Sequence, residues 1–407
     1  MKKLTKILAA ALIVLSVTSC GPKKAKYVFL FIGDGMGFGP VNLAEAYRAQ
    51  SRGVIGMDPL NFTQFPVMGE ATTYCADSPI TCSSAAGTAL ATGSKTNIRM
   101  LGIAPDSTTN LTSIAYKIHD AGYSVGITST VQVNHATPAA FYGHNIARSA
   151  YYPIGLEIPQ TDFEFFAGGG LLHPTGKKGE DLKSLYEVIA ESGYTVANGY
   201  DDFLAKKDSV KDHILMVQSE NSALICPYAL GHKEGDLQHK DIVNAAVEIL
   251  SRNTKGFFLM SEGGEIDWTA HSNDLAGTIY EIYGFEEAIE VALEFYRQHP
   301  DETLIIVTAD HNTGGVSLGY ERGYKYDLTV IDSITESSTT SDVEKYMDDQ
   351  TAIDSINVKA RVGWTTLSHT GDPVPVWAIG ACSEKFAGRM DNTDIPKRIC
   401  TAMGVEF

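Results

Sequence analysis

Basic residues are scarce in this chain of 407 residues. Only 32 Lys and Arg stand against 49 Asp and Glu, which gives a formal net charge of −17 at pH 7. A surface with this excess of acid repels nucleic acid, so we expect no nucleic-acid partner. An acidic protein that handles an anionic substrate needs a local positive site, and bound metal ions are an economical way to make one.

The first apolar run, residues 7–17, is too short to span a bilayer comfortably. Lys2, Lys3 and Lys6 precede it, which is the pattern of an export signal rather than of an anchor. We therefore predict a signal peptide over residues 1–19. Its removal would take the net charge of the mature chain from −17 to −20.

Small residues then lead to a cysteine in Val17-Thr18-Ser19-Cys20, which resembles the lipobox of bacterial lipoproteins. This predicts cleavage before Cys20, a lipid on its sulfur that anchors the protein to a membrane, and a short tether over 20–25. The protein would then be exported, as a periplasmic or cell-surface lipoprotein. The alternative is an ordinary secreted protein with a coincidental cysteine at the cleavage point.

Cysteines are also few, and five remain after Cys20. An odd number cannot all pair, although an oxidising compartment permits disulfides. A bridge between Cys382 and Cys400 is conceivable, but their spacing alone does not establish it.

Continuous apolar runs indicate strands that are buried on both faces. Patterns with helical periodicity lie between them, and no internal repeat interrupts the series. Alternating strands and helices predict an α/β fold with a largely parallel sheet covered on both faces, in a single domain over 26–407. Residues 151–239 and 321–363 fit the rhythm poorly and are expected to be insertions. The predicted strands are 27–32, 123–128, 256–260, 304–308 and 374–380, and the predicted helices include 111–121, 242–250 and 278–296.

Several polar residues follow the ends of these strands, where open α/β sheets place their binding sites. Asp34 stands in a glycine-rich turn directly after the first strand. The turn lacks the third glycine of a dinucleotide-binding fingerprint, and a carboxylate there would repel a pyrophosphate. Asp34 is therefore either a cap of the next helix or a metal ligand.

Three further segments carry residue types that bind metals. Asp267 and His271 are four residues apart, so on a helix they face the same way and could hold one divalent ion. Asp310 and His311 are adjacent after the strand at 304–308, and His369 lies in a loop before the strand at 374–380. Each segment alone also fits an ordinary surface hydrogen bond, but their recurrence near strand ends favours a shared metal centre.

Ser83 opens a helix of small residues. The simplest interpretation is that Ser83 only caps this helix. The same position also directs backbone amides and the helix dipole toward an incoming phosphate. Because the segment lacks a Gly-x-Ser-x-Gly elbow, metal coordination would have to activate this serine as a nucleophile.

Together these motifs resemble the alkaline phosphatase family, in family order from about residue 27 to the end of the chain. The resemblance rests on the aspartate after the first strand, the Ser-Ala-Ala type helix start with Thr92-Gly93-Ser94-Lys95-Thr96, Ala136-Thr137-Pro138-Ala139-Ala140, Glu262-Gly through Asp267 and His271, Thr308-Ala309-Asp310-His311, and His369-Thr370-Gly371. It implies the three-layer fold of that family and a phosphomonoesterase that releases inorganic phosphate through a phosphoserine.

The resemblance also implies roles for individual residues. Ser83, rather than Ser84, occupies the nucleophile position by its register with Lys95-Thr96, and Arg148 would clamp two phosphate oxygens. Two zinc ions and a third ion, magnesium by analogy, would complete the site. The implied ligands are Asp267, His271 and His369 for one zinc, Asp34, Asp310 and His311 for the second, and Asp34, Thr137 and Glu262 for the third ion.

Three positions depart from the best-known members of the family. Cys82 replaces an aspartate that could help to orient Arg148. His135 replaces an aspartate near the third ion and could shift that site toward zinc or cobalt. Trp268 replaces a lysine near the phosphate and could shape the substrate mouth. His135 and Trp268 are thus candidate substrate-binding residues.

Other functions remain open at this point. A phosphodiesterase of the same superfamily is the nearest alternative, although the two-oxygen grip of Arg148 favours a monoester. A sulfatase is disfavoured because the Cys82 segment lacks the Cys/Ser-x-Pro-x-Arg pattern. A non-catalytic metal- or phosphate-binding surface lipoprotein and a nicotinamide-dependent oxidoreductase explain fewer of the motifs. The resemblance allows a homodimer without requiring one.

Overall fold

The computed structural model describes residues 24–210, 213–219, 225–320, 322–339 and 350–407. The predicted signal peptide and Cys20 lie outside these residues. Within the described part of the chain, no helix combines the length and the apolar character needed to cross a membrane.

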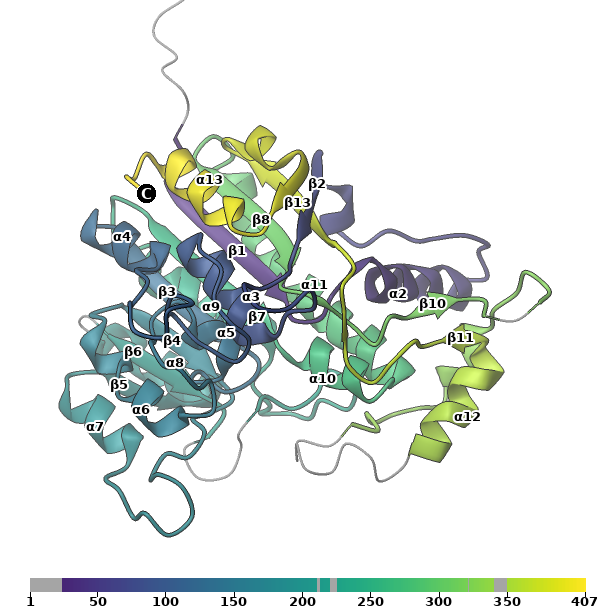
Figure 1. The fold of residues 1–407 in the computed structure, drawn as a ribbon, viewed down its shortest axis with the longest axis horizontal. Coiled ribbons are helices and arrows are strands. Elements are labelled where there is room, and N and C mark those ends of the chain that lie inside the picture. Colours follow the sequence, from purple (N-terminus) through teal and green to yellow (C-terminus); the bar gives the residue numbers. More distant parts are fainter. Residues whose placement is uncertain (1–23, 211–212, 220–224, 321, 340–349) are drawn as a thin grey trace, which may run out of the picture.

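A ten-stranded sheet forms the centre of the molecule (Figure 1). Its order is β14-β2-β13-β8-β1-β7-β3-β4-β6-β5. Strand β13 is antiparallel to both of its neighbours, and the other pairings are parallel. The strands are β1 (Tyr27–Gly33), β2 (Val67–Thr72), β3 (Ser124–Ser129), β4 (Phe165–Gly168), β5 (Thr195–Asn198), β6 (Ile214–Val217), β7 (Phe257–Gly263), β8 (Thr303–Ala309), β13 (Val374–Gly380) and β14 (Gly388–Asp391).

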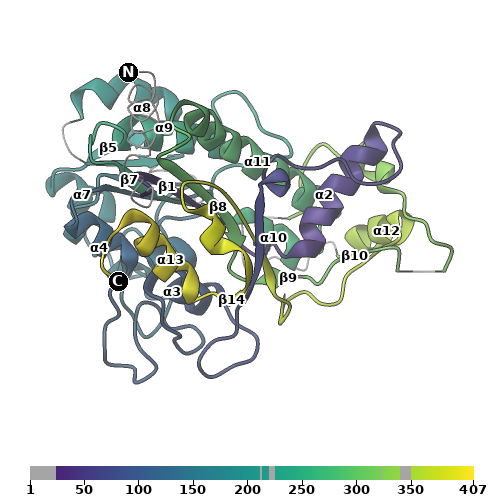
Figure 2. The ribbon, with the colours of Figure 1, turned by 90° about the horizontal axis from the view of Figure 1, so that it is seen from above.

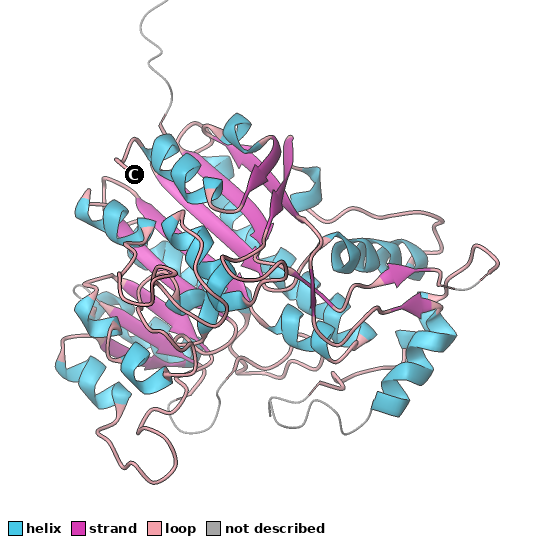
Figure 3. Ribbon diagram, in the orientation of Figure 1, coloured by secondary structure: helices cyan, strands magenta, loops and turns pink. Residues whose placement is uncertain are grey.

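Helices cover both faces of the sheet (Figures 2 and 3), so the predicted three-layer α/β fold is confirmed. On one face lie α9 and α11, which pack on each other, and on the other lie α3, α4, α5 and α13. The helices are α2 (Phe38–Ser51), α3 (Ser83–Thr92), α4 (Ile114–Asp120), α5 (Ala136–Ala139), α6 (Tyr151–Gly155), α7 (Leu185–Glu191), α8 (Gly199–Lys206), α9 (His239–Leu250), α10 (Glu265–His271), α11 (Leu275–Gln298), α12 (Gln350–Ala360) and α13 (Asp394–Met403), with short 3₁₀ turns η1 (Phe62–Gln64), η2 (Ile158–Gln160), η3 (Lys207–Ser209), η4 (Leu328–Ile331) and η5 (Ser383–Phe386).

The central strands explain why their apolar runs are uninterrupted. All seven residues of β1, of β7 and of β8 are buried, because helices cover both sides of each strand. The five predicted strands all form, with ends that differ by at most three residues from those expected. Their buried side chains make up most of one large core.

The two segments expected to be insertions differ from each other. Residues 151–239 contain β4, β5 and β6, which extend the central sheet at one edge, so this segment continues the sheet. In 321–363, the described elements lie outside that sheet. There β11 (Val362–Gly363) pairs with β10 (Ser317–Leu318), and α12 and η4 pack against α2 and its neighbours in a second, smaller core.

The conceivable bridge between Cys382 and Cys400 does not form. Cys400 is a buried thiol in the structure. Burial raises its pKa to about 11, which keeps it protonated and unreactive.

Candidate metal centre and nucleophile

The register of the three central strands brings three carboxylates to one edge of the sheet. Gly33 of β1 lies opposite Gly263 of β7 and Ala309 of β8. Asp34 and Asp310 therefore leave their strands side by side, and Glu262 lies one residue before the same level. All three side chains are buried.

Asp267, His271 and His369 converge beside these strand ends. The first two lie one helical turn apart on α10, and His271 Nε2 is 3.3 Å from Asp267 Oδ2. His369 comes from β12 (His369–Thr370), which pairs with β9 (Asn312–Thr313) and so returns to the end of β8. The Nε2 atoms of His271 and His369 are 3.1 Å apart. The structure thus brings together the three residues expected to share one metal.

Asp34, Asp310 and His311 form a second group. His311 Nε2 lies 3.3 Å from Asp34 Oδ1 and 3.3 Å from Asp310 Oδ2. Ligand atoms of His311 also fall within 4.8 Å of those of Asp267 and His369, so the two groups adjoin. Their mixture of imidazole nitrogens and carboxylate oxygens is the donor set that zinc takes in proteins.

A third group offers only oxygen atoms. Thr137 Oγ1 lies 3.4 Å from Asp34 Oδ2. The Glu262 carboxylate is next to both side chains and accepts a hydrogen bond from the Ser129 hydroxyl on β3. Burial raises the pKa of Glu262 to about 7. An all-oxygen set of this kind suits magnesium.

Neighbouring groups orient the ligands. The Leu367 carbonyl accepts a hydrogen bond from His271 Nδ1 at 2.7 Å, and the Thr81 carbonyl accepts one from His369 Nδ1 at 2.9 Å. The Nε2 atom of each histidine therefore faces the other ligands. The Thr313 hydroxyl donates to Asp267 and lies 3.2 Å from His311 Nδ1. The two carbonyl contacts were not predicted from the sequence, since any residue offers a carbonyl.

The electrostatics of the second group favour a bound cation. Burial and the neighbouring Asp310 raise the pKa of Asp34 well above its usual range, and burial raises that of Asp310 to about 8. Asp34 Oδ1 and Asp310 Oδ2 accept no hydrogen bond although both are buried. Burial also lowers the pKa of His311, which keeps it neutral with a free lone pair. Burying these carboxylates without a cation would cost folding free energy. The residues therefore fit the metal that the sequence implies for this group.

Ser83 opens α3 at the mouth of the second group. Its hydroxyl lies 3.4 Å from His311 Nε2 and 3.4 Å from Arg148 Nη1. The hydroxyl of Ser84 instead lies 3.3 Å from Cys82 Sγ. Geometry therefore gives Ser83, and not Ser84, access to the metal ligands.

Arg148 has a partner that the sequence motifs do not indicate. Its Nη2 donates to His135 Nε2 over 3.1 Å, because a guanidinium can only donate. Burial and the charge of Arg148 lower the pKa of His135 to about 3, so His135 is neutral and can accept. Trp268 is 4% exposed and meets the His135 ring edge-on at 6.0 Å. Trp268 therefore contacts the site through His135.

The family profile described as alkaline phosphatase matches residues 25–405. The chain belongs to the alkaline phosphatase family. It is 30% identical to alkaline phosphatase 3 of Bacillus subtilis, over 93% of this chain and 89% of that protein. Among solved structures, the cold-active alkaline phosphatase of a Shewanella species has a TM-score of 0.80 and 29% identity, covering 93% of this chain and 99% of that one.

An alkaline phosphatase from the Antarctic bacterium TAB5 is also similar. A variant of that enzyme, with a histidine replaced by glutamate and Mg bound in its M3 site, has a TM-score of 0.75 and 26% identity over 95% of this chain and all of that one. The present chain is thus a phosphatase enzyme of this family, whose members depend on metals.

Proposed function

We propose that this alkaline phosphatase hydrolyses phosphate monoesters through a phosphoserine on Ser83, with two zinc ions and a third ion that is magnesium. The observation that carries this proposal is the position of the Ser83 hydroxyl, 3.4 Å from both His311 and Arg148, beside two adjoining groups of metal ligands. A nucleophile, an anion-binding cation and two ligand groups at one edge of the sheet suit phosphoryl transfer.

Each ligand group would hold one ion. Asp267, His271 and His369 would hold one zinc, and Asp34, Asp310 and His311 the second. Asp34, Thr137 and Glu262 would hold magnesium. Bound zinc would supply a lowered pKa for the serine hydroxyl and positive charge for the transferring phosphoryl group.

The reaction consists of two displacements at phosphorus. Ser83 Oγ attacks phosphorus, the ester oxygen leaves and takes up a proton as the alcohol, and phosphoserine remains. Water then attacks the phosphoserine, the P–O bond to Ser83 breaks, and inorganic phosphate is released with the hydroxyl restored. Arg148 would hold two phosphate oxygens throughout, aided by amides at the start of α3. Two inversions give retention at phosphorus.

The test compares 4-nitrophenyl phosphate with bis(4-nitrophenyl) phosphate as substrates for protein loaded with zinc and magnesium. We expect the monoester to react faster, chelation to abolish the activity, and zinc to restore it. Preference for the diester would favour the phosphodiesterase alternative, and loss of both activities in fully loaded protein would favour a non-catalytic binding protein.

Ser83→Ala and Ser84→Ala form a matched pair of variants for the nucleophile. Ser83→Ala should lose at least about 10³-fold in kcat, whereas Ser84→Ala should keep most of it. Acid quenching with labelled monoester should trap one phosphoryl group per chain in the wild type and in Ser84→Ala, and none in Ser83→Ala. Equal labelling of both variants would contradict the assignment.

We also propose that the protein is exported and anchored through a lipid on Cys20. The motif at Val17-Thr18-Ser19-Cys20 supports this proposal. Mass spectrometry of the mature N-terminus from native membranes should find acylated Cys20, and Cys20→Ala should leave the membrane fraction. An unacylated mature N-terminus would refute the proposal.

A further inference from the structure

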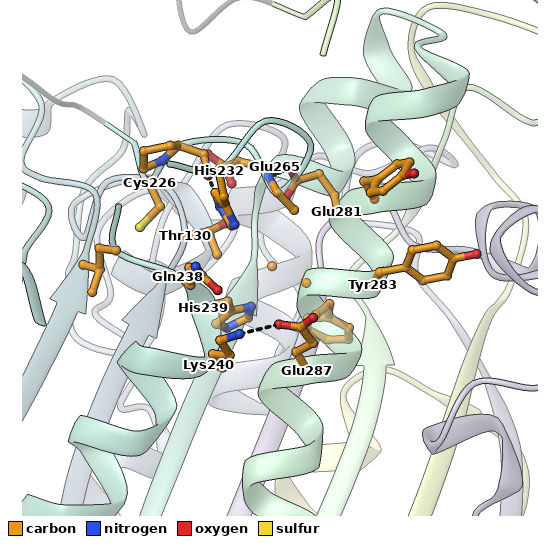
Figure 4. Close-up of a pocket in the computed structure, with 17 residues that line it drawn as sticks. Thr130, Cys226, His232, Gln238, His239, Lys240, Glu265, Glu281, Tyr283 and Glu287 are labelled. Carbon is orange, nitrogen blue, oxygen red and sulfur yellow. Dashed lines mark hydrogen bonds and ion pairs between the residues drawn. The ribbon is translucent and has the colours of Figure 1, made fainter. Parts of the chain in front are cut away.

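A cavity of about 280 Å³ lies beside the metal centre, between the start of α10, the first half of α11 and the start of α9 (Figure 4). The residues of the proposed reaction do not line it. Thr130 and Cys226 close one side, and Tyr280 and Tyr283 stand on another.

Two glutamates from different helices meet in this cavity. Glu265 begins α10 and Glu281 lies on α11, and their exposed fractions are only 1% and 6%. The amide of Ala229 donates to Glu281 Oε1 over 2.7 Å. Glu265 Oε1, by contrast, is buried and accepts no hydrogen bond. A buried carboxylate oxygen without a donor costs free energy unless a ligand satisfies it.

The two carboxyl groups lie against each other. Their side chains are within hydrogen-bonding reach of one another, and Glu265 also lies beside the side chain of Thr130. A cation placed between two facing carboxylates interacts favourably with both.

The basic side chains that line the cavity have other partners. Lys240 forms an ion pair with Glu287 at 2.9 Å (Figure 4), and His232 Nε2 donates to the Pro227 carbonyl at 2.7 Å. His239 Nε2 is 2.8 Å from Ser261 Oγ, and burial lowers its pKa to about 3. Within the described residues around the cavity, these basic groups therefore leave the glutamate pair without a cationic partner.

We propose that Glu265 and Glu281 bind a calcium ion in this cavity, as a structural site separate from the catalytic metals. Carboxylate oxygens are hard ligands, and calcium accepts an irregular shell completed by water, for which the cavity has room. The bound ion would neutralise both carboxylates and satisfy Glu265 Oε1. It would also join α11 to the start of α10, the helix that carries Asp267 and His271, and so stabilise this part of the fold.

The experiment measures calcium binding to zinc-loaded protein and its effect on thermal unfolding. Equilibrium dialysis should find one more calcium per chain in the wild type than in Glu281→Gln or Glu265→Gln. Calcium at about 100 times its Kd should raise the Tm of the wild type by roughly 3–5 °C and leave both variants unchanged. Binding at the catalytic centre would be common to wild type and Glu281→Gln, so the difference isolates this cavity.

Glu287→Gln is the matched control, because Glu287 lies on the same helix but is exposed and paired with Lys240. It should keep both the calcium and the Tm rise. Without calcium, Glu281→Gln should unfold at a higher temperature than the wild type, since an amide can donate a hydrogen bond to Glu265. Glu281→Gln should thus have the higher Tm without calcium and lose the Tm rise with calcium. A variant that merely folds poorly would have a lower Tm in both conditions. Equal calcium content and equal Tm shifts in wild type and Glu281→Gln would overturn the proposal.

Discussion

The two sides of the proposed active site are built differently. On the metal side, Asp34, Glu262 and Asp310 are buried at the ends of three adjacent parallel strands whose register places them together. On the phosphate side, Ser83 begins a helix and Arg148 lies on a partly exposed loop, where two side chains, His135 and Ser83, hold its guanidinium. The sheet thus fixes the ligands, whereas local contacts position the phosphate-binding groups.

This contrast teaches where substitutions should be tolerated. A strand-end ligand cannot move without a shift in the register of the whole central sheet, so its loss cannot be compensated. A side chain on a loop can find a new partner nearby. Loss of a metal ligand should therefore abolish activity, whereas changes of Arg148 and of the side chains that hold it should reduce activity by graded amounts.

The largest effect is expected from Asp310→Asn on the metal side. Loss of this carboxylate should lower kcat by at least about 10³-fold and remove zinc, because an amide is a weaker ligand than a carboxylate. The metal-free variant should nevertheless unfold at the same or a higher temperature than metal-free wild type, since the repulsion between Asp310 and Asp34 is relieved. Zinc analysis and thermal unfolding check both parts. A destabilised apoprotein that keeps its zinc would indicate a purely structural role for Asp310.

The next largest effect tests the phosphate side. Arg148→Ala should lower kcat/KM about 10²-fold, because one charge-assisted donor to the phosphate is lost, while zinc content stays normal. Arg148→Lys should recover only part of the loss, since an ammonium lacks the two-pronged geometry. Steady-state kinetics with 4-nitrophenyl phosphate measure both variants. Loss of zinc in Arg148→Ala would show that Arg148 also supports the metal ligands, which contradicts the separation of the metal side from the phosphate side.

The strand-end ligands illustrate what could be predicted from the sequence. The segments that form β1, β7 and β8 are mostly apolar because both faces of each strand are buried. The strands, and the positions where the chain leaves them, could therefore be predicted. Strands β4, β5 and β6 were missed because each has only four residues, too few to show a period.

The supporting contacts could not be predicted for a different reason. The carbonyls of Leu367 and Thr81 leave no mark in the sequence, since every residue has one. Thr313 reaches Asp267 only because the two-residue strands β9 and β12 pair. The partnership of His135 with Arg148 likewise depends on a loop conformation that spacing does not encode.

A smaller effect is expected from Thr313→Val, which keeps the shape of the side chain but removes its hydroxyl. Asp267 would lose a hydrogen-bond donor and His311 a neighbour at Nδ1, so we expect a 10- to 100-fold loss in zinc affinity with kcat nearly normal at saturating zinc. Zinc titration of the apoprotein measures the affinity. Thr365→Val is a suitable control, because Thr365 is exposed and its hydroxyl donates to the Gly315 carbonyl.

The smallest effect should come from His135→Ala, which removes the acceptor that orients Arg148. Loss of one hydrogen bond of this kind should raise KM about 3- to 10-fold and leave kcat and zinc content close to wild type. In the Arg148→Ala background the same substitution should have little further effect on KM, since the group that His135 positions is already absent. A double-mutant cycle on KM measures this coupling. Additive effects would show that His135 acts independently of Arg148, and the phosphate side would then have a second contact with the substrate.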